Sequence, residues 1–319
     1  MSISKGRYEC MRSVRILLTE DCNANCSNCL NQSFRAKDKY INVSKFSKLC
    51  KYFQENDVLG VKIMGGEPTI HPEFEQLINI AQENFKRVSV FTNAITDRIT
   101  SFHPREEDGI SYNFRFRKHI SKEKLLLQYP GYRALEILVD DKTCPNQILE
   151  ESLSFLKYYY NRVSVMLTLD CTNGIFKKRS QTLPILEKIY LSLISEGITV
   201  GLDHAIPVCY IYGSKIPVYG KGVFCDTGCA GLVDSSCNLR YCNQHNSVLI
   251  NLFSEGKIIP FQIFENHLNY VYFQKQIEVM DKICKECICY GKICNGGCFI
   301  GNNFDSREDI LENTNLPVI

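Results

Sequence analysis

The chain has 319 residues, of which 45% are hydrophobic and 23% charged, and its formal net charge is +2. This length can bury one large core and a smaller second one, since single domains commonly reach about 250 residues. The near-neutral, interspersed charge excludes a strongly basic or acidic surface and favours neither nucleic acid nor an anionic membrane as partner. No stretch approaches the roughly 20 apolar residues of a membrane span, and residues 1–13 lack the apolar core of a secretory signal, so we expect a cytoplasmic protein.

Short β-rich runs alternate with longer amphipathic segments over the first two thirds of the chain. The predicted strands are residues 14–18, 61–64, 87–92, 134–139, 162–169 and 198–202. The predicted helices are residues 44–55, with Ser44 as its cap, 72–85, 146–160 and 183–194. Residues 110–116 are either one more strand or part of an irregular insertion. Strands alternating with helices favour an α/β fold with a parallel sheet, either doubly wound or curled toward a barrel.

The pattern changes at about residue 205, where Gly, Pro and Cys punctuate short apolar runs such as residues 247–253 and 257–261. The whole chain holds 17 cysteines. The cytosol keeps thiols reduced, so cysteines at this density are expected to bind metal or take part in catalysis rather than form disulfides. This composition is typical of a small domain held together by metal.

Three cysteines, Cys22, Cys26 and Cys29, directly follow the first predicted strand. Parallel α/β folds place their functional sites at this end of a strand. Three thiolates at this spacing can wrap one loop around a four-iron cluster and leave one iron without a protein ligand. The alternatives are a zinc site without its fourth ligand or three incidental thiols, although structural zinc usually takes four ligands and no His is near.

A second motif, Gly65-Gly66-Glu67-Pro68, follows the second predicted strand. Two adjacent glycines let the backbone approach a ligand closely, because no β-carbon stands in the way. The carboxylate of Glu67 could accept a hydrogen bond from an ammonium group. Taken alone, the motif would be an ordinary turn from a strand into a loop.

The two motifs together resemble the radical S-adenosylmethionine (SAM) superfamily, whose members carry a CxxxCxxC loop after the first strand and a GGEP-like motif after the second. The resemblance implies a partial (β/α)6 TIM-like barrel in which the three cysteines bind a 4Fe-4S cluster. It also implies SAM contacts from Gly65, Gly66, Glu67, Pro68, Thr92 and Asn93. An electron from the cluster would cleave SAM, and the resulting 5′-deoxyadenosyl radical would abstract a hydrogen atom from the substrate. Asn28 departs from the family, which usually has an aromatic residue near the adenine at this position.

Nine further cysteines lie late in the chain: Cys225, Cys229, Cys237, Cys242, Cys284, Cys287, Cys289, Cys294 and Cys298. Thiolate sites of this kind suit zinc nearly as well as iron-sulfur clusters. Four of them, Cys284, Cys287, Cys294 and Cys298, resemble the CxxCx5CxxxC run of the SPASM domain, which follows the barrel in many radical SAM enzymes and binds auxiliary clusters. The middle spacing is six residues rather than five, and no cysteine follows the last one. The resemblance implies a barrel over residues 1–208 and a SPASM- or twitch-like domain over residues 209–319.

Two auxiliary clusters are one interpretation of these cysteines. Cys284, Cys287, Cys289 and Cys294 would then hold the distal cluster, and Cys298 would join Cys225 or Cys229, Cys237 and Cys242 around the proximal one. The alternative is a single auxiliary cluster, as in the shorter twitch domain. Cys209, at the end of the last predicted barrel strand, is a candidate hydrogen donor to a substrate radical, although a lone buried Cys is usually a small core residue.

The resemblance favours a ribosomally made peptide as the substrate, modified by a crosslink, an epimerisation or an oxidation. A dehydrogenase of a sugar or alcohol is the runner-up, activation of a sulfatase is a third option, and an iron-sulfur electron carrier is the non-enzymatic alternative. A carrier is disfavoured because it needs four protein ligands for each cluster. The first expected partner is an electron donor such as flavodoxin or ferredoxin. Since the first cluster begins at Cys22, a peptide leader is expected to dock on a separate leader-peptide-binding protein or on the barrel itself.

Overall fold

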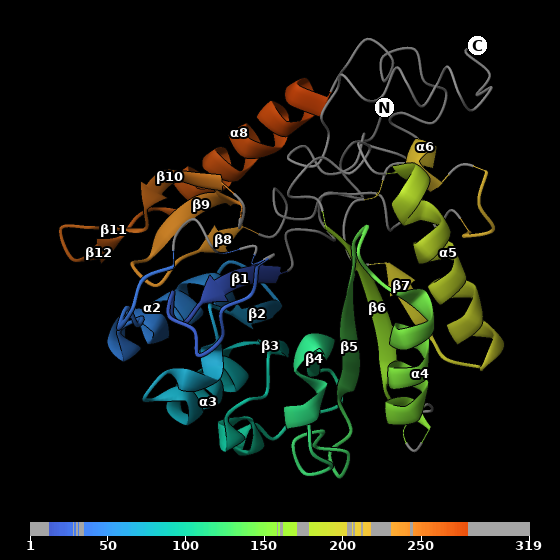
Figure 1. The fold of residues 1–319 in the computed structure, drawn as a ribbon. Coiled ribbons are helices and arrows are strands. Elements are labelled where there is room, and N and C mark those ends of the chain that lie inside the picture. Colours follow the sequence, from blue (N-terminus) through green and yellow to red (C-terminus); the bar gives the residue numbers. More distant parts are fainter. Residues whose placement is uncertain are drawn as a thin grey trace. The chain divides into compact units, whose positions relative to one another are not determined.

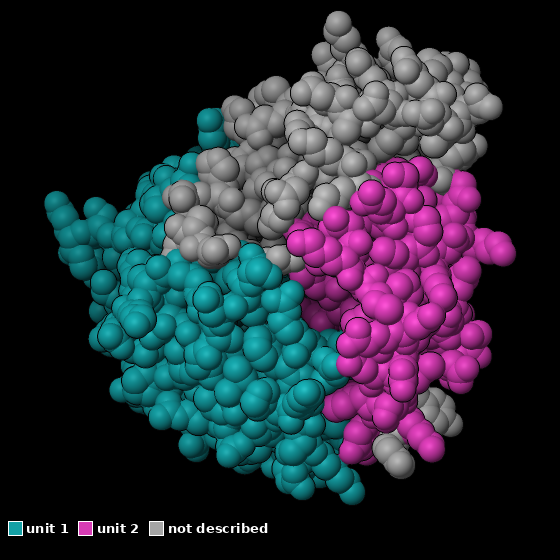
Figure 2. All heavy atoms as spheres, in the orientation of Figure 1, with its two compact units in different colours: residues 1–134, 226–272 teal, residues 135–225, 273–319 magenta. Residues whose placement is uncertain are grey.

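The computed structural model describes residues 13–27, 29, 31, 35–157, 159, 162–170, 179–202, 206, 208–211, 213–217, 231–242 and 245–279 (Figure 1). The chain divides into two compact units, Met1–Ala134 with Asp226–Tyr272 and Leu135–Cys225 with Phe273–Ile319 (Figure 2). This division differs from the expected boundary after residue 208. Because much of residues 209–319 lies outside the described residues, the barrel-plus-cysteine-domain assignment stays a prediction.

The first unit contains four parallel neighbouring strands. They are β1 (Ser13–Leu17), β2 (Gly60–Met64), β3 (Arg87–Thr92) and β4 (Gly109–Asn113). The register pairs Ser13 with Gly60 and Leu17 with Met64, so β1 and β2 begin and end together. Helices α2 (Val43–Gln54) and α3 (Phe74–Asn84) connect the first three strands and bury their apolar faces. The carboxyl ends of these strands therefore meet along one edge of the sheet.

The strand and helix predictions hold in this region, with corrections at the ends. Asn42 rather than Ser44 caps α2, because its side chain accepts a hydrogen bond from the Lys45 N–H at 3.2 Å. The second helix begins at Phe74 rather than at residue 72. The ambiguous residues 110–116 divide between β4 and the 3₁₀ helix η4 (Phe114–His119).

A late segment joins the same sheet on the other side of β1. Strand β8 (Leu232–Val233) pairs in parallel with β1, and β9 (Asn238–Cys242) pairs antiparallel with both β8 and β10 (His245–Asn251). A small two-stranded sheet of β11 (Phe253–Ser254) and β12 (Lys257–Ile258) follows.

Helix α8 (Phe261–Val279) was missed by the sequence prediction, which expected only short apolar runs in this region. Phe261 and Phe264 in its first turn pack edge-on against Tyr52 and Phe53 of α2, with ring centroids 5.5 Å and 5.2 Å apart. This aromatic cluster holds the start of α8 against α2.

The second unit contains most of β5 (Tyr132–Val139), then α4 (Pro145–Leu156), β6 (Ser164–Leu169), α5 (Arg179–Ser195), β7 (Val200–Leu202) and the short α6 (Val208–Ile211). Strands β6 and β7 are parallel, as expected for strands joined by a helix. The predicted apolar stripe of α5 is buried, including Leu186 and Leu193. Among the described helices, none is long and apolar enough to cross a membrane.

Candidate functional site

The segment that carries the three early cysteines, here called the cysteine loop (residues 19–29), continues the pairing between β1 and β2. The Gly66 N–H donates to the Thr19 carbonyl and the Glu67 N–H donates to the Asp21 carbonyl, both at 2.9 Å. The loop therefore leaves β1 with its backbone hydrogen-bonded to the second motif. The two sequence motifs, far apart in the chain, form one continuous structure.

The two glycines of the motif are required by this close approach. A β-carbon on Gly65 would lie 2.7 Å from the Thr19 carbonyl oxygen, and one on Gly66 would lie 2.1 Å from the Asp21 carbonyl oxygen and 2.9 Å from the Cys22 β-carbon. Cβ atoms essentially never come within 3.0 Å of a heavy atom outside their own residue and its two chain neighbours. The glycine pair predicted the close approach of a ligand, whereas the neighbour that the two glycines accommodate here is the cysteine loop itself.

Glu67 joins the ends of β2 and β3 with a carboxylate that is 1% exposed. One oxygen accepts from the Thr69 N–H (3.1 Å), the Thr69 hydroxyl (2.6 Å) and the Thr92 hydroxyl (2.7 Å). The other oxygen accepts from the Asn93 N–H at 2.7 Å. Burial raises the pKa of Glu67, and these four donors oppose that shift. The carboxylate thus holds the protein's own strand ends together.

Asn93 adds a third connection, because its side-chain amide donates to the Asn23 side chain in the cysteine loop at 2.8 Å. The turn after it places Ala94 at a φ of 53°. The buried Lys124 holds this turn, donating from Nζ to the Ala94 carbonyl at 2.8 Å and lying 2.9 Å from the Asp97 carboxylate. Neither Asn23 nor Lys124 was predicted from the sequence, since Asn23 stands at a variable position of the CxxxCxxC motif and Lys124 belongs to no motif.

Cys22, Cys26 and Cys29 are half-buried and not in disulfides. The Ala24 N–H donates to the Cys22 sulfur at 3.4 Å. Arg35 donates to the carbonyl groups of Cys22 and Ala24, which places a permanent positive charge beside the loop. Burial raises the pKa of the Cys22 thiol, while the Ala24 N–H and Arg35 act in the opposite direction.

This donor set fits an iron-sulfur cluster. Three reduced, partly accessible thiols lie on one loop beside an N–H donor and a guanidinium, both of which stabilise thiolate charge. Within the described part of the chain, no three His, Cys, Asp or Glu side chains are grouped to hold a metal ion. The thiolates of a four-iron cluster bind different irons and lie farther apart than the ligands of one ion.

Most of the late cysteines, together with Asn28, lie outside the described residues: Cys225, Cys229, Cys284, Cys287, Cys289, Cys294 and Cys298. Cys209 lies in α6 and Cys242 ends β9, with no description of either side chain. Cys237 is fully buried at the turn before β9, with a φ of 64°, and burial raises its pKa to about 11. The extended backbone of β9 spans about 13 Å at ~3.3 Å per residue. That separation disfavours one cluster bound by both Cys237 and Cys242.

Comparison with known proteins identifies the first part of the chain. Residues 16–107 match the family model of the Radical SAM superfamily. Residues 16–107 therefore correspond to a radical SAM domain. The matched range includes the cysteine loop, the glycine motif and Asn93, which are the segments that the hydrogen bonds above bring together.

Curated relatives resemble the radical SAM domain over a limited length. The subtilosin biosynthesis protein AlbA of Bacillus subtilis is 32% identical over 76 residues, covering 24% of this chain and 17% of AlbA. A GTP 3′,8-cyclase of Chlorobaculum tepidum is 31% identical over 84 residues, 26% of each chain. The chain thus spans about a quarter or less of the length of these relatives.

Solved structures resemble the chain over most of its length. Streptococcus suis SuiB bound to the precursor peptide SuiA has a TM-score of 0.66 at 14% identity, covering 90% of this chain and 72% of SuiB. Native anSMEcpe, with bound AdoMet (SAM) and the Cp18Cys peptide, has a TM-score of 0.65 at 14% identity, covering 96% of this chain and 97% of that one. At this identity the likeness shows the fold alone, and it confirms the predicted α/β fold with a large parallel sheet, consistent with a partial barrel.

Proposed function

We propose that the protein is a radical SAM enzyme that reductively cleaves SAM and abstracts a hydrogen atom from a ribosomally made peptide. The observation that carries the proposal is the bonding of the cysteine loop to both Gly66 and Asn93, which brings the segments that we assign to cluster and SAM binding together at one sheet edge. A peptide substrate is supported by SuiB and anSMEcpe, both solved with bound peptides, and by AlbA, named for the synthesis of a bacteriocin. The modification is a crosslink, an epimerisation or an oxidation.

The site residues have separate roles in this proposal. Cys22, Cys26 and Cys29 hold the 4Fe-4S cluster, which when bound supplies the electron that cleaves SAM. Gly66 lets the cysteine loop lie against β2, and Glu67 fixes the Asn93 backbone beside it. Preorganising these segments lowers the cost of binding SAM in one orientation.

The late cysteines hold one or two auxiliary 4Fe-4S clusters in a SPASM- or twitch-like region within residues 209–319. Cys242, at the end of β9, is a candidate ligand of an auxiliary cluster, together with cysteines from residues 225–229 and 284–298. Cys209 is proposed as a hydrogen donor at the end of the barrel. An electron donor such as flavodoxin or ferredoxin reduces the cluster, and the peptide leader docks on a separate protein or on the barrel itself.

The second candidate substrate class is a small molecule. The runner-up prediction from the sequence named a sugar or an alcohol, whereas the relatives point to a nucleotide. The observation that favours it is the set of relatives named GTP 3′,8-cyclase, which match the same early segment as AlbA. We assign SAM binding to this segment, so these matches support the shared chemistry of SAM cleavage more than they support either substrate class.

The test uses anaerobically reconstituted protein beside a variant in which Cys22, Cys26 and Cys29 are all changed to Ala. We expect about twelve irons per chain with two auxiliary clusters, or about eight with one, and about four fewer in the variant. With a chemical reductant, the wild type alone should form 5′-deoxyadenosine from SAM. Zinc in place of iron, or no 5′-deoxyadenosine, would refute the radical SAM activity. Faster 5′-deoxyadenosine formation with GTP than with peptides encoded near the gene would refute the peptide assignment.

A further inference from the structure

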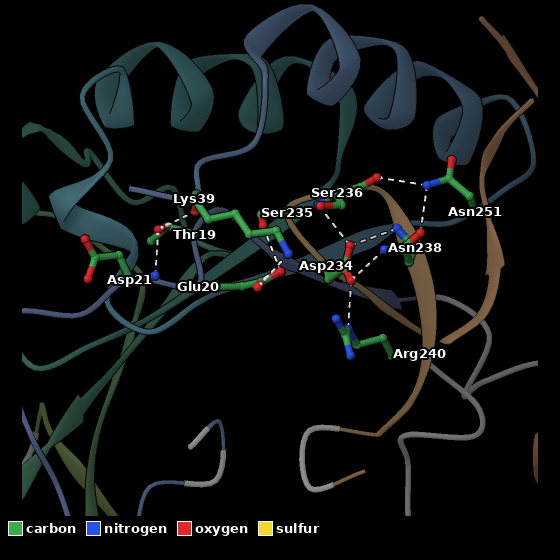
Figure 3. Close-up of polar contacts among 10 residues, drawn as sticks. All are labelled: Thr19, Glu20, Asp21, Lys39, Asp234, Ser235, Ser236, Asn238, Arg240 and Asn251. Carbon is green, nitrogen blue, oxygen red and sulfur yellow. Dashed lines mark hydrogen bonds and ion pairs between the residues drawn. The ribbon is translucent and has the colours of Figure 1, made fainter. Parts of the chain in front are cut away.

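A buried carboxylate lies at the start of the cysteine loop. Glu20 is 3% exposed and precedes Cys22 by two residues. Its two oxygens accept hydrogen bonds from Lys39 Nζ at 2.7 Å and from the Ser235 hydroxyl at 2.9 Å (Figure 3). A buried charge is costly unless it is paired and hydrogen-bonded, so both partners are needed to hold this side chain in the interior.

Ser235 comes from the turn between β8 and β9, and a second buried carboxylate makes this turn rigid. Asp234 is fully buried and accepts from the backbone N–H groups of Ser236 and Asn238, both at 2.9 Å, and from Arg240 Nε at 2.7 Å. The Asn251 side chain also donates to the Ser236 carbonyl at 3.0 Å. Figure 3 shows these contacts converging on one turn. The Ser235 hydroxyl is therefore presented to Glu20 in a fixed position.

The Glu20 backbone is held as well. Its N–H donates to the Lys39 carbonyl at 3.1 Å, while the flanking Thr19 and Asp21 carbonyls accept from Gly66 and Glu67. These backbone hydrogen bonds hold this segment against the end of β2. The Glu20 carboxylate adds two side-chain bonds to this segment, two residues before Cys22.

We propose that Glu20 is a positioning residue for the cysteine loop, and that Ser235 couples the late hairpin (residues 231–251) to this loop through it. The inference rests on the proposed function, because it takes the cysteine loop as the holder of the SAM-binding cluster. Under this proposal the hairpin takes part in the radical SAM site, although it lies far from the cysteine loop in sequence. A displacement of the hairpin would then change SAM cleavage without any change in the cysteines.

The test compares Ser235→Ala, Ser235→Thr and Ser236→Ala. Ser236 is the matched control, since it enters the same turn through its backbone N–H and carbonyl. We expect Ser235→Ala to retain iron but to cleave SAM about tenfold more slowly, the equivalent of ~1.4 kcal/mol, as for the loss of one hydrogen bond to a charged group. Ser235→Thr should retain the wild-type rate because it keeps the hydroxyl.

Two further measurements separate positioning from a general loss of structure. In metal-free protein, amide hydrogen exchange of residues 19–24 should be faster in Ser235→Ala than in Ser236→Ala. In a double-mutant cycle, Ser235→Ala should have little further effect in a Glu20→Ala background, because that background lacks the oxygen that accepts from Ser235. Equal exchange and equal rates for the two Ala variants would overturn the inference. A wild type that binds no iron would refute the proposed function instead, and the exchange measurement would still decide the coupling.

Discussion

Replacing Gly66 by Ala would force the cysteine loop away from β2. The new β-carbon would lie 2.1 Å from the Asp21 carbonyl oxygen, a backbone atom that cannot rotate aside. Ordinary carbon–oxygen contacts begin at about 3.3 Å, so the two segments must separate by about 1 Å. The bond from the Glu67 N–H to the same oxygen, now 2.9 Å, would then be lost.

The expected cost follows from these two effects. Overpacking costs about 1–3 kcal/mol and the lost hydrogen bond about 1 kcal/mol, which together give roughly 2–4 kcal/mol. The native arrangement of the loop would become roughly 30- to 700-fold less populated relative to displaced arrangements. We expect Gly66→Ala to lose about four irons per chain, those of the SAM-binding cluster, and to form no 5′-deoxyadenosine.

The assay is iron content and 5′-deoxyadenosine formation after anaerobic reconstitution, with thermal unfolding measured on the same samples. Gly60→Ala is the matched control, because it lies at the other end of β2 and its nearest contact to a new β-carbon would be 3.4 Å. A Gly66→Ala protein that retained iron and activity at the level of Gly60→Ala would refute the steric argument.

Three further predictions concern charged side chains. Arg35→Gln should make the midpoint potential of the cluster more negative in an EPR-monitored titration, because it removes a positive charge, and Arg35→Lys should restore it. Lys124→Met should raise the KM for SAM about tenfold in steady-state assays, because it leaves the Ala94 carbonyl buried without its donor. Burial opposes ionisation of Asp108, yet hydrogen bonds from Arg105 and other donors lower its pKa overall. The stability that ionised Asp108 provides is therefore fully present above its ordinary pKa of 3.8 and is lost as the pH falls through the lower folded pKa. Urea unfolding should show Asp108→Asn destabilised relative to wild type at pH 7, with a difference that shrinks as the pH is lowered below 3.8.

Local patterns in the sequence predicted the central part of the fold well. The third strand was placed at residues 87–92 and β3 has these bounds, because its apolar alternation is strong and a turn follows it. The cap of α2 was misplaced, since Asn42 and Ser44 are both good capping residues and sequence alone does not rank them. Strand β8 has two residues and carries no periodicity, so it was not predicted.

The candidate site was predicted as separate motifs, and their connections were not. Glu67 and Thr92 were both singled out, but sequence spacing does not reveal that one bonds to the other. Ser235 and Glu20 belong to no motif, and their contact depends on the pairing of β8 with β1. Such long-range contacts depend on the tertiary fold, for which the local pattern carries no signal.

The pairing of β8 with β1 has a consequence for how the protein folds. Until residues 232–233 have been synthesised, β1 is an edge strand with unpaired backbone groups, which is the kind of surface that aggregates. Ile16 pairs with Val233, 217 residues later in the sequence, and contacts at such a separation form slowly. The cysteine loop therefore reaches its final geometry late in folding, and iron loaded before that stage would meet a loop without its Ser235 contact.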